Sequence, residues 1–326
     1  MGLVERVIAG DRVALSRLLS LVVEARDELD GEMESLLRMS GRAHVIGITG
    51  PPGSGKSSLI ASLAREFRGR RKTVGVVAVD PTSPFSGGAV LGDRVRMQSL
   101  LGDPGVFVRS LASRGSPGGI AGTAADAVRV LDAAGYQLVL LETVGAGQAE
   151  VEVARVAHSV VLLEVPGMGD EVQAIKAGVL EMADIFVVNK AEREGADRLV
   201  RALRLAVQGA GAAGAWVRPV LKTTGSTGAG IGPLADALEA HLVHLRESGQ
   251  WDVRVEAGMW REAVEAAREQ FATELLAGMR PEEVEALKTA VRERRMTPRE
   301  AGKLLIKKFR GVGSPSRYGD MSRSLK

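Results

Sequence analysis

The chain has 326 residues, 45% of them hydrophobic, so it can bury a large core in one or two domains. It contains no cysteine, which excludes disulfides, zinc–thiolate sites and thiol nucleophiles and fits a reducing cytoplasm. The net charge of +3 is uneven, because residues 292–326 carry 11 Lys/Arg and 3 Asp/Glu and leave the rest at −5. No apolar run approaches the roughly 20 residues that span a bilayer, and the N-terminus is charged too early for a signal peptide, so we expect a soluble cytoplasmic protein.

Residues 3–40 carry apolar side chains at helical spacing, with Asp11 as the expected N-cap. From residue 43, short and mostly continuous apolar runs alternate with helical patterns, which is typical of strands covered by helices on both faces. This alternation predicts a doubly wound, mostly parallel α/β sheet. The expected strands are 43–49, 73–80, 105–108, 137–142, 159–165, 185–189 and 216–221, with helices such as 56–67 and 121–134 between them.

After about residue 244 the strand pattern stops, and residues 256–310 are helical in period. Pro281 stands at an expected first helical position, and Thr297 and Glu300 have the spacing of a capping box. We therefore expect four segments: an N-terminal helical segment (1–42), an α/β domain (43–245), a C-terminal helical arm (246–310) and a flexible tail (311–326).

Between the first expected strand and the helix that follows it lies the pattern of a P-loop, Gly50-x-x-x-x-Gly55-Lys56-Ser57. Its glycines let successive backbone N–H groups face phosphates, and the positive end of the helix adds to that field. Lys56 is expected to reach the β- and γ-phosphates, and the Ser57 hydroxyl to bind Mg²⁺. The predicted phosphate cradle consists of Gly50, Pro51, Pro52, Gly53, Ser54, Gly55, Lys56, Ser57 and Ser58.

A second element is the apolar strand that ends in Glu142, three residues before Gly145. In P-loop proteins this arrangement brings an acid to the Mg²⁺ shell and a glycine amide to the γ-phosphate. The strand and the P-loop together predict a Mg²⁺-dependent nucleoside triphosphatase that binds its nucleotide through the cradle.

The run Asn189-Lys190-Ala191-Glu192 is typical of the guanine-reading segment of GTPases. The acid accepts hydrogen bonds from the guanine ring N–H and exocyclic amine, a donor pair that adenine lacks, and the lysine stem covers the ring. Here the acid is Glu192 instead of the usual Asp. The usual final motif, Ser-Ala-Leu, is replaced by Thr224-Gly225-Ser226, whose backbone we expect to contact the base.

Four longer motifs resemble those of one family. They are Asp80–Pro84, Gly87–Met97, Glu142–Glu150 and Pro166–Lys176, and their order and spacing are similar to those of the MeaB/ArgK family of SIMIBI-class GTPases. The resemblance extends over nearly the whole chain. It implies a GTP hydrolase that acts as a G-protein metallochaperone. Such a protein gates cofactor loading and protection of an adenosylcobalamin-dependent acyl-CoA mutase, usually methylmalonyl-CoA mutase.

The same resemblance implies roles for individual residues. Asp80 and Asp93 would belong to the Mg²⁺ and switch machinery, with Glu142 as the acid beside the metal. Gln148 and the loop Gly167–Lys176 would couple the nucleotide state, GTP or GDP, to the partner. Asp80, Asp93 and Gln148 are all candidates for positioning the attacking water. The C-terminal helices would form a dimerisation arm, so the resemblance implies a homodimer.

Three alternatives stay open at this point. A nickel-insertion GTPase would need a Cys/His cluster; His241 and His244 have i, i+3 spacing and could bind a metal, although such residues are more often exposed on a helix. A small-molecule kinase, or a kinase of amino-acid transport as some relatives are labelled, would use the same cradle but seldom reads guanine. A nucleic-acid-associated ATPase could use the basic segment 292–326, but aromatic residues make up only 3% of the chain and leave little for base stacking, so we expect no nucleic-acid partner.

Overall fold

The computed structural model describes the backbone of residues 2–24, 29–80, 100, 102–112, 119–143, 151–152, 154–167, 177–207 and 216–311. The chain divides into two compact units, residues 1–262 and residues 263–326. Within the described residues, no helix is both long enough and apolar enough to cross a membrane. The four segment boundaries expected from the sequence stay a prediction.

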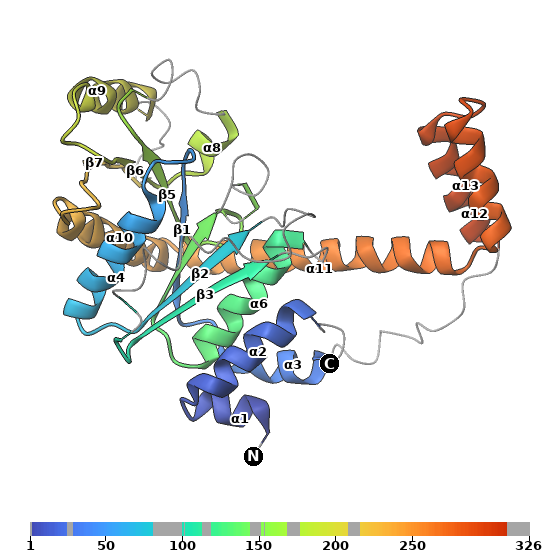
Figure 1. Cartoon of the computed structure of the whole chain (residues 1–326), viewed down its shortest axis with the longest axis horizontal. Helices are drawn as coiled ribbons and strands as arrows, with labels where there is room; N and C mark the ends of the chain where they lie inside the picture. The colour runs from blue at the N-terminus through green and yellow to red at the C-terminus, as the bar shows by residue number, and fades with distance from the viewer. Residues whose placement is uncertain are drawn as a thin grey trace. The chain divides into compact units, whose positions relative to one another are not determined.

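A single sheet of seven strands forms the centre of the first unit, in the order β3-β2-β4-β1-β5-β6-β7 (Figure 1). Every strand pairing that the structure describes is parallel, which confirms the expected doubly wound α/β class. Because these strands are parallel, their carboxyl ends meet at one edge of the sheet, and β1 lies near the middle with later strands on both sides of it. The strands are β1 (His44–Thr49), β2 (Val74–Asp80), β3 (Val106–Ala112), β4 (Leu138–Thr143), β5 (Ser159–Glu164), β6 (Ile185–Val188) and β7 (Val220–Lys222).

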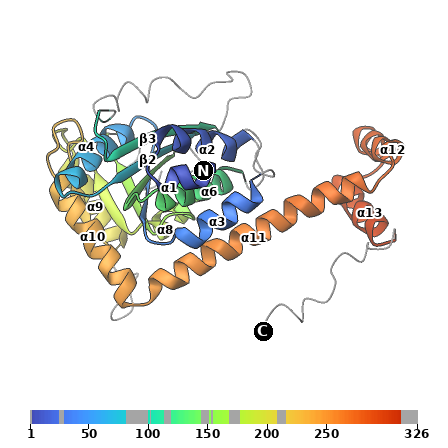
Figure 2. The ribbon, with the colours of Figure 1, turned by 90° about the horizontal axis from the view of Figure 1, so that it is seen from below.

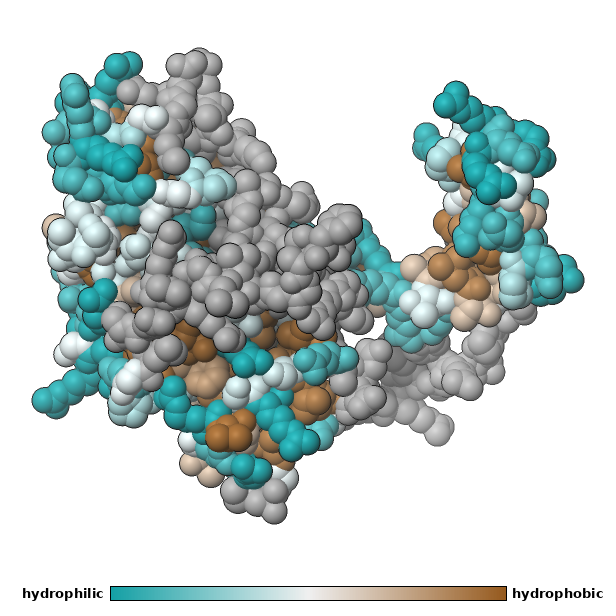
Figure 3. All heavy atoms as spheres, in the orientation of Figure 1, coloured by the Kyte–Doolittle hydropathy of each residue, from teal (hydrophilic) through white to brown (hydrophobic). Residues whose placement is uncertain are grey.

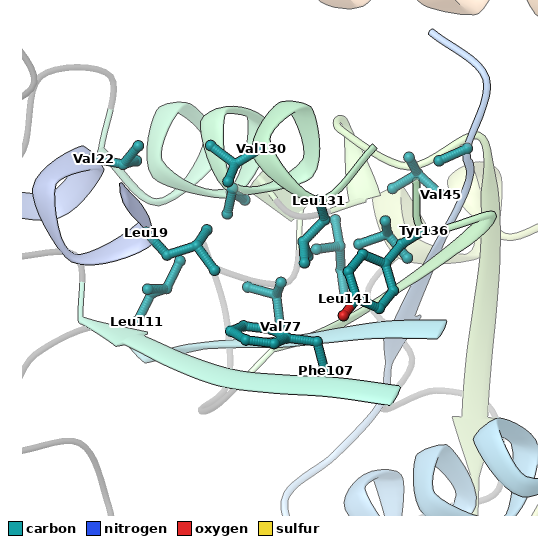
Figure 4. Packing of buried hydrophobic residues seen from close by; sticks show 14 of the residues in the cluster. Leu19, Val22, Val45, Val77, Phe107, Leu111, Val130, Leu131, Tyr136 and Leu141 are labelled. Atoms are coloured by element: carbon teal, nitrogen blue, oxygen red, sulfur yellow. The ribbon is translucent and has the colours of Figure 1, made fainter. Parts of the chain in front are cut away.

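One face of the sheet is covered by α6 and by the helical lead-in that the sequence predicts. Asp11 caps α2 as expected, because its carboxylate accepts hydrogen bonds from the N–H groups of Val13 at 2.9 Å and Ala14 at 3.0 Å. Figure 4 shows side chains of α2, α6 and β2 meeting in the apolar core of this face. The helices are α1 (Leu3–Ile8), α2 (Arg12–Glu24), α3 (Asp30–Met39) and α6 (Gly119–Ala133).

The opposite face is covered by α4 (Lys56–Gly69) and α10 (Ile231–Glu247). Figures 1 and 2 show these two helices side by side. Ile48 of β1, Leu63 of α4 and Leu234 of α10 belong to one buried cluster. Burial of this apolar face places the first turn of α4 beside the carboxyl edge of the sheet, since α4 follows β1 directly.

At the β6–β7 end of the sheet, α9 (Ala196–Val207) packs against both strands, and the short α8 (Ala177–Met182) contacts β5. Here the expected strand 216–221 is wrong in extent, because β7 covers only Val220–Lys222. Trp216 has another role: its indole N–H donates to the backbone oxygen of Asp184 at 2.9 Å. Val217 is 84% exposed and contributes no core packing.

All four histidines of the chain lie near the amino ends of the central strands or on α10, on the edge opposite the P-loop. His44 Nε2 and His241 Nδ1 each lie 2.7 Å from the hydroxyl of Ser159, and all three side chains are buried. The expectation that His241 is an exposed helix residue is therefore wrong, since it is 0% exposed. His244 is half-buried and packs against the Trp216 ring at 5.5 Å. Among the described residues no group of three or more His, Cys, Asp or Glu side chains could hold a metal ion.

Asp184 connects this histidine cluster to α11 (Gln250–Ala277). Arg254 of α11 donates to both carboxylate oxygens of Asp184, at 2.9 and 2.8 Å, and to the backbone oxygen of His158 at 2.6 Å. Asp184 also accepts the N–H of Val160 at 2.9 Å, and its Oδ1 lies 3.4 Å from His241 Nε2. The first turns of α11 are thus fixed to the amino edge of the sheet.

The histidine cluster predicts a pH dependence of stability. Burial lowers the pKa of His158 and of His241 to about 4, while the unfolded chain keeps an ordinary value near 6.5. Below about pH 6.5 the unfolded chain therefore binds protons that the folded chain does not. We expect the free energy of unfolding to be highest above this pH and to fall between pH 6.5 and 5, by up to about 1.4 kcal/mol per pH unit for each histidine.

Urea unfolding at several pH values between 7 and 5 measures this slope. A His241→Asn variant, which has one titrating imidazole fewer, should give a shallower slope than the wild type. A stability that does not change over this range would contradict the buried, neutral state of these rings.

The second unit contains the end of α11 together with α12 (Pro281–Arg292) and α13 (Pro298–Gly311). Pro281 is the first residue of its helix, as expected. The capping box is confirmed, because Thr297 N–H donates to the Glu300 carboxylate at 2.9 Å and Glu300 N–H donates to the Thr297 hydroxyl at 3.2 Å. The rings of Phe271 and Phe309 meet edge to face at 5.1 Å. The predicted flexible tail lies, beyond residue 311, outside the described residues.

Candidate nucleotide-binding site

The predicted nucleotide site lies at the carboxyl edge of the sheet, where ligands bind in open α/β folds. The loops that follow β1, β6 and β7 contact one another there through hydrogen bonds, and the carboxyl end of β4 lies beside them. The structure therefore brings together motifs that are distant in the sequence: Glu142 stands 85 residues after Ser57, and Asn189 stands 47 residues after Glu142.

The P-loop is packed so tightly that glycine is required at two of its positions. Gly50 has φ +146° and Gly55 has φ +92°, which L side chains rarely adopt. A Cβ at Gly50 would lie 2.4 Å from the backbone oxygen of Leu163, and a Cβ at Gly55 would lie 2.6 Å from the side-chain nitrogen of Asn189. The loop is thus seated directly against the ends of β5 and β6.

Lys56 is the first residue of α4 and is buried. Its ammonium group donates to the backbone oxygen of Gly50 at 2.7 Å and to that of Pro51 at 3.3 Å. The N-terminus of this 14-residue helix adds positive potential at the same place. A cation and a helix N-terminus that meet in a glycine-rich loop suit an anion of high charge density, such as a polyphosphate.

Ser57 and Glu142, which the sequence predicts on separate motifs, are in direct contact. The Ser57 hydroxyl donates to Glu142 Oε1 at 2.6 Å, and both side chains are buried. Glu142 stands on β4 opposite Ile48 of β1, two positions before the P-loop begins at Gly50. A hydroxyl and a carboxylate next to a phosphate cradle are the hard oxygen ligands that Mg²⁺ prefers.

Asn189 links the P-loop to the loop after β7. Its side-chain nitrogen donates to the backbone oxygen of Ser54 at 2.7 Å, and its side-chain oxygen accepts from the Thr223 hydroxyl and the Gly225 N–H, each at 3.0 Å. Asn189 is 2% exposed. A buried amide that uses both ends in this way fixes the predicted base segment and the predicted cradle to each other.

Lys190 and Glu192 line the outer side of the same segment. Lys190 has φ +54°, rare for a non-glycine residue, and its ammonium group donates to the Gly53 backbone oxygen at 2.7 Å. The exposed Glu192 carboxylate accepts the Thr224 hydroxyl at 2.9 Å. Its own backbone N–H and the Thr224 hydroxyl lower the pKa of Glu192, so the carboxylate is ionised at neutral pH and can accept hydrogen bonds from a base.

Two residues near this site were missed by the sequence reasoning. Thr223 is buried and donates to Asn189, and the Ser62 hydroxyl of α4 donates to the backbone oxygen of Gly225 at 2.8 Å. Thr223 follows β7 immediately, so its position next to the predicted base-contacting residue Thr224 could have indicated that it belongs to the site. Ser62 gives no signal in the sequence, because it resembles any small residue on a helix face.

Several predicted site residues lie outside the described part of the structure. Asp80 is the last residue of β2, with only its backbone described, and it stands two positions beyond Ala78, which is paired with Glu142. Asp93, Gly145 and Gln148 lie outside the described residues, as does most of the loop Gly167–Lys176. The roles expected for these residues stay predictions.

A P-loop that opens a helix, an acid on the neighbouring strand and a base segment joined to the loop, all on one edge of a parallel sheet, define a P-loop nucleoside triphosphatase. The family model described as "Methylmalonyl Co-A mutase-associated GTPase MeaB" matches residues 15–280. The chain belongs to this family of GTPases, which confirms the resemblance found in the sequence.

Individual relatives agree with this assignment. A putative GTPase of Pyrococcus horikoshii is 48% identical over 252 residues, which cover 76% of this chain and 79% of that one. A putative GTPase of Pyrococcus abyssi is 41% identical over 314 residues, which cover 95% and 97%. A crystal structure of an LAO/AO transport system kinase has a TM-score of 0.68 at 23% identity and covers 94% of this chain and 96% of that one. At this identity, the last likeness shows the fold alone.

Proposed function

We propose that this GTPase is a Mg²⁺-dependent G-protein chaperone that gates cofactor loading and protection of an adenosylcobalamin-dependent acyl-CoA mutase. The match to the mutase-associated family over residues 15–280 carries the proposal. The partner is methylmalonyl-CoA mutase or a relative that takes the same cofactor, and GTP hydrolysis is the switch. A cytoplasmic location and a homodimeric state belong to the same proposal.

The side chains at the phosphate site fit a magnesium ion. Ser57 and Glu142 would hold it, since their oxygens already lie within hydrogen-bond distance of each other beside the cradle. When bound, Mg²⁺ neutralises charge on the β- and γ-phosphate oxygens. Lys56 and the P-loop amides would act on the same oxygens and stabilise the charge that develops during phosphoryl transfer.

The base site supports guanine as the nucleotide base. Asn189 fixes the segment, the Lys190 stem would cover the ring, and Glu192 would accept the ring N–H and the exocyclic amine. Thr224, Gly225 and the exposed Ser226 follow β7 beside it. A kinase has no comparable need to read guanine, so the base site favours the GTPase switch over small-molecule phosphorylation.

The homodimer is supported by the surface of the second unit. Its described residues include partly exposed apolar side chains: Val264, Phe271, Leu276 and Ile306. Brown, hydrophobic surface is visible on this unit in Figure 3. Exposed apolar patches of this kind commonly mark interfaces between proteins.

A Ser57→Ala variant tests the magnesium assignment. We expect it to lose most of the difference between GTP affinity in Mg²⁺ and in EDTA, because a hydroxyl ligand is removed while the cradle remains. Isothermal titration of GTP under both conditions measures that difference. The neighbouring Ser58→Ala variant is the control, since loss of the Ser58 hydroxyl is expected to weaken GTP binding equally with and without the metal. A Ser57→Ala variant with the full Mg²⁺ effect would contradict the assignment.

The experiment for the function has two stages. The first is a competition of GTP against ATP, and of GDP against ADP, for the purified protein with Mg²⁺; equal affinities would overturn guanine reading. The second measures transfer of adenosylcobalamin to apo-methylmalonyl-CoA mutase with GTP, with GDP and with no chaperone. Transfer rates that ignore both the chaperone and its nucleotide would overturn the mutase proposal, and phosphate transfer from GTP to a small-molecule acceptor would favour a kinase.

A further inference from the structure

The turn after β7 lies directly on α4, the helix whose first turn belongs to the phosphate cradle. A Cβ at Gly225 would lie 3.2 Å from the backbone nitrogen of Leu59 and 3.3 Å from its Cα, so the turn and the helix are in close contact. Leu59 follows Lys56 on the same helix. The turn that we expect to contact the base is therefore seated on the element that presents the cradle to the phosphates.

A buried hydroxyl on α4 fixes this contact. Ser62 Oγ donates to the Gly225 backbone oxygen at 2.8 Å, and Ser62 is buried. The Arg65 side chain approaches the same hydroxyl oxygen at 3.4 Å from within the helix. Because a guanidinium group can only donate and a carbonyl can only accept, the hydroxyl proton of Ser62 is directed to Gly225.

The direction of this hydrogen bond is unusual for a hydroxyl inside a helix, which commonly bonds to the carbonyl one turn earlier. Ser20, Ser35 and Thr273 follow that habit, because each donates to the backbone oxygen four residues before it, at 3.2, 3.0 and 3.0 Å. Ser62 instead donates to a residue that is 163 positions away in the sequence. Its hydroxyl thus serves a contact between two segments of the site.

The backbone of Gly225 is held from two sides. Its N–H donates to Asn189 Oδ1 at 3.0 Å, and its carbonyl accepts from Ser62. That carbonyl shares a peptide unit with the N–H of Ser226, and in a trans peptide the two groups point in opposite directions. The described backbone contains no cis peptide, so Ser62 directs the Ser226 N–H away from α4. Ser226 is exposed, and within the described residues its N–H has no hydrogen-bond partner.

We propose that Ser62 is a positioning residue for base binding: its hydroxyl holds the Gly225 carbonyl on α4 and thereby aims the Ser226 N–H at an acceptor on the base. In guanine this acceptor is O6, whereas adenine carries a donor amine at the same ring position. Since α4 also carries the cradle, one helix sets the position of this donor relative to the phosphates. The inference rests on the proposed binding of guanine.

The test compares the affinities of GDP, IDP, 2-aminopurine riboside diphosphate and pyrophosphate for the full-length protein with Mg²⁺. GDP and IDP carry O6, the 2-aminopurine nucleotide lacks it, and pyrophosphate reports the cradle alone. We expect Ser62→Ala to weaken GDP and IDP by the same factor, about three- to tenfold, because one hydrogen bond to the base is misaligned. The affinities of the other two ligands should not change. Alanine is a better helix former than serine, so α4 is expected to form in the variant.

Two further variants separate positioning from general damage. Thr227→Val is the matched control, since it removes a hydroxyl from the same turn that donates to the Thr224 oxygen at 3.3 Å and not to α4. All four affinities should stay at the wild-type values in this control. Gly225→Ala should reproduce the pattern of Ser62→Ala, because its methyl group would push the turn away from Leu59.

Three results in Ser62→Ala would each overturn the inference. They are an unchanged GDP affinity, an equal loss for pyrophosphate, which would mean damage to the cradle, and an equal loss for the 2-aminopurine nucleotide. A wild-type protein that binds GDP and ADP equally would be a different failure, because it would overturn guanine reading itself and leave Ser62 with no acceptor to align.

Discussion

Replacement of Lys56 by alanine is expected to weaken GTP binding by about two to three orders of magnitude, because a buried cation is removed from the centre of the phosphate cradle. Lys56 is 8% exposed, and its ammonium group lies within 2.7 Å of the Gly50 backbone oxygen. Equilibrium binding of GTP, GDP and GMP measures the loss, which should be large for the two nucleotides that carry a β-phosphate and small for GMP.

Lys190→Ala is the matched control for this variant. Its ammonium group donates to another carbonyl of the same loop, that of Gly53 at 2.7 Å, but it stands on the base side. We expect it to weaken all three guanine nucleotides by a similar, smaller factor. GTP affinity near that of the wild type in Lys56→Ala, with an unchanged melting temperature, would contradict the phosphate role of Lys56.

The second large effect is expected on stability, from Asp184→Ala. The substitution removes the acceptor of two Arg254 hydrogen bonds and of the Val160 N–H, and leaves the guanidinium without its carboxylate. Breaking a buried pair costs about 3–5 kcal/mol, and we expect the lower end because the Arg254 side chain is 32% exposed. Urea unfolding at pH 7 measures the change in free energy of unfolding.

Asp197→Ala provides the comparison. Asp197 forms an ion pair with Lys222, but its side chain is 75% exposed, so its removal should change the free energy of unfolding by less than about 1 kcal/mol. Asp184→Asn should fall between the two variants, since it keeps the side-chain volume and one acceptor oxygen. Equal stability of Asp184→Ala and the wild type would show that α11 is not held through this pair.

Much of the fold could be predicted because its signals are local. Most of the strands are short, largely apolar runs in the sequence, and a strand covered on both faces needs no alternation. The expected strand 105–108 ends too early, because β3 continues through Arg109 and Ser110 to Ala112. The prediction failed where an apolar residue has a different use. Trp216 reads as strand but serves as a donor to Asp184, so the strand begins four residues later, at Val220.

The prediction that His241 is exposed failed for a different reason, because the burial of this side chain depends on partners that are distant in the sequence. On α10 it has the i, i+3 relation to His244 that an exposed pair would have. Ser159, whose hydroxyl bridges it to His44, belongs to β5, and His44 belongs to β1. Nothing in the helix pattern reveals that β1 and β5 are neighbours and that both carry polar side chains at their first positions.

In the candidate site, too, features within one segment could be predicted and contacts between distant segments could not. The cradle from Gly50 to Ser57 is one continuous segment, and its pattern follows from phosphate chemistry, so it could be read directly. That Ser57 and Glu142 should meet follows from motif order, and the structure brings them to 2.6 Å. The Thr224–Glu192 contact could not be predicted, because it depends on the turn that brings the loop after β7 against the loop after β6.

The amide of Asn189 has a consequence for how affinity is distributed along the nucleotide. This one side chain joins Ser54 of the cradle to the turn at Gly225, so its hydrogen bonds hold the two binding regions together before a ligand enters. A nucleotide is then a chelating ligand: its two ends share one loss of translational freedom, and the second end binds at a high effective concentration. Guanosine and pyrophosphate added as separate molecules should each bind weakly, and the protein thereby distinguishes an intact nucleotide from its fragments by length as well as by chemistry.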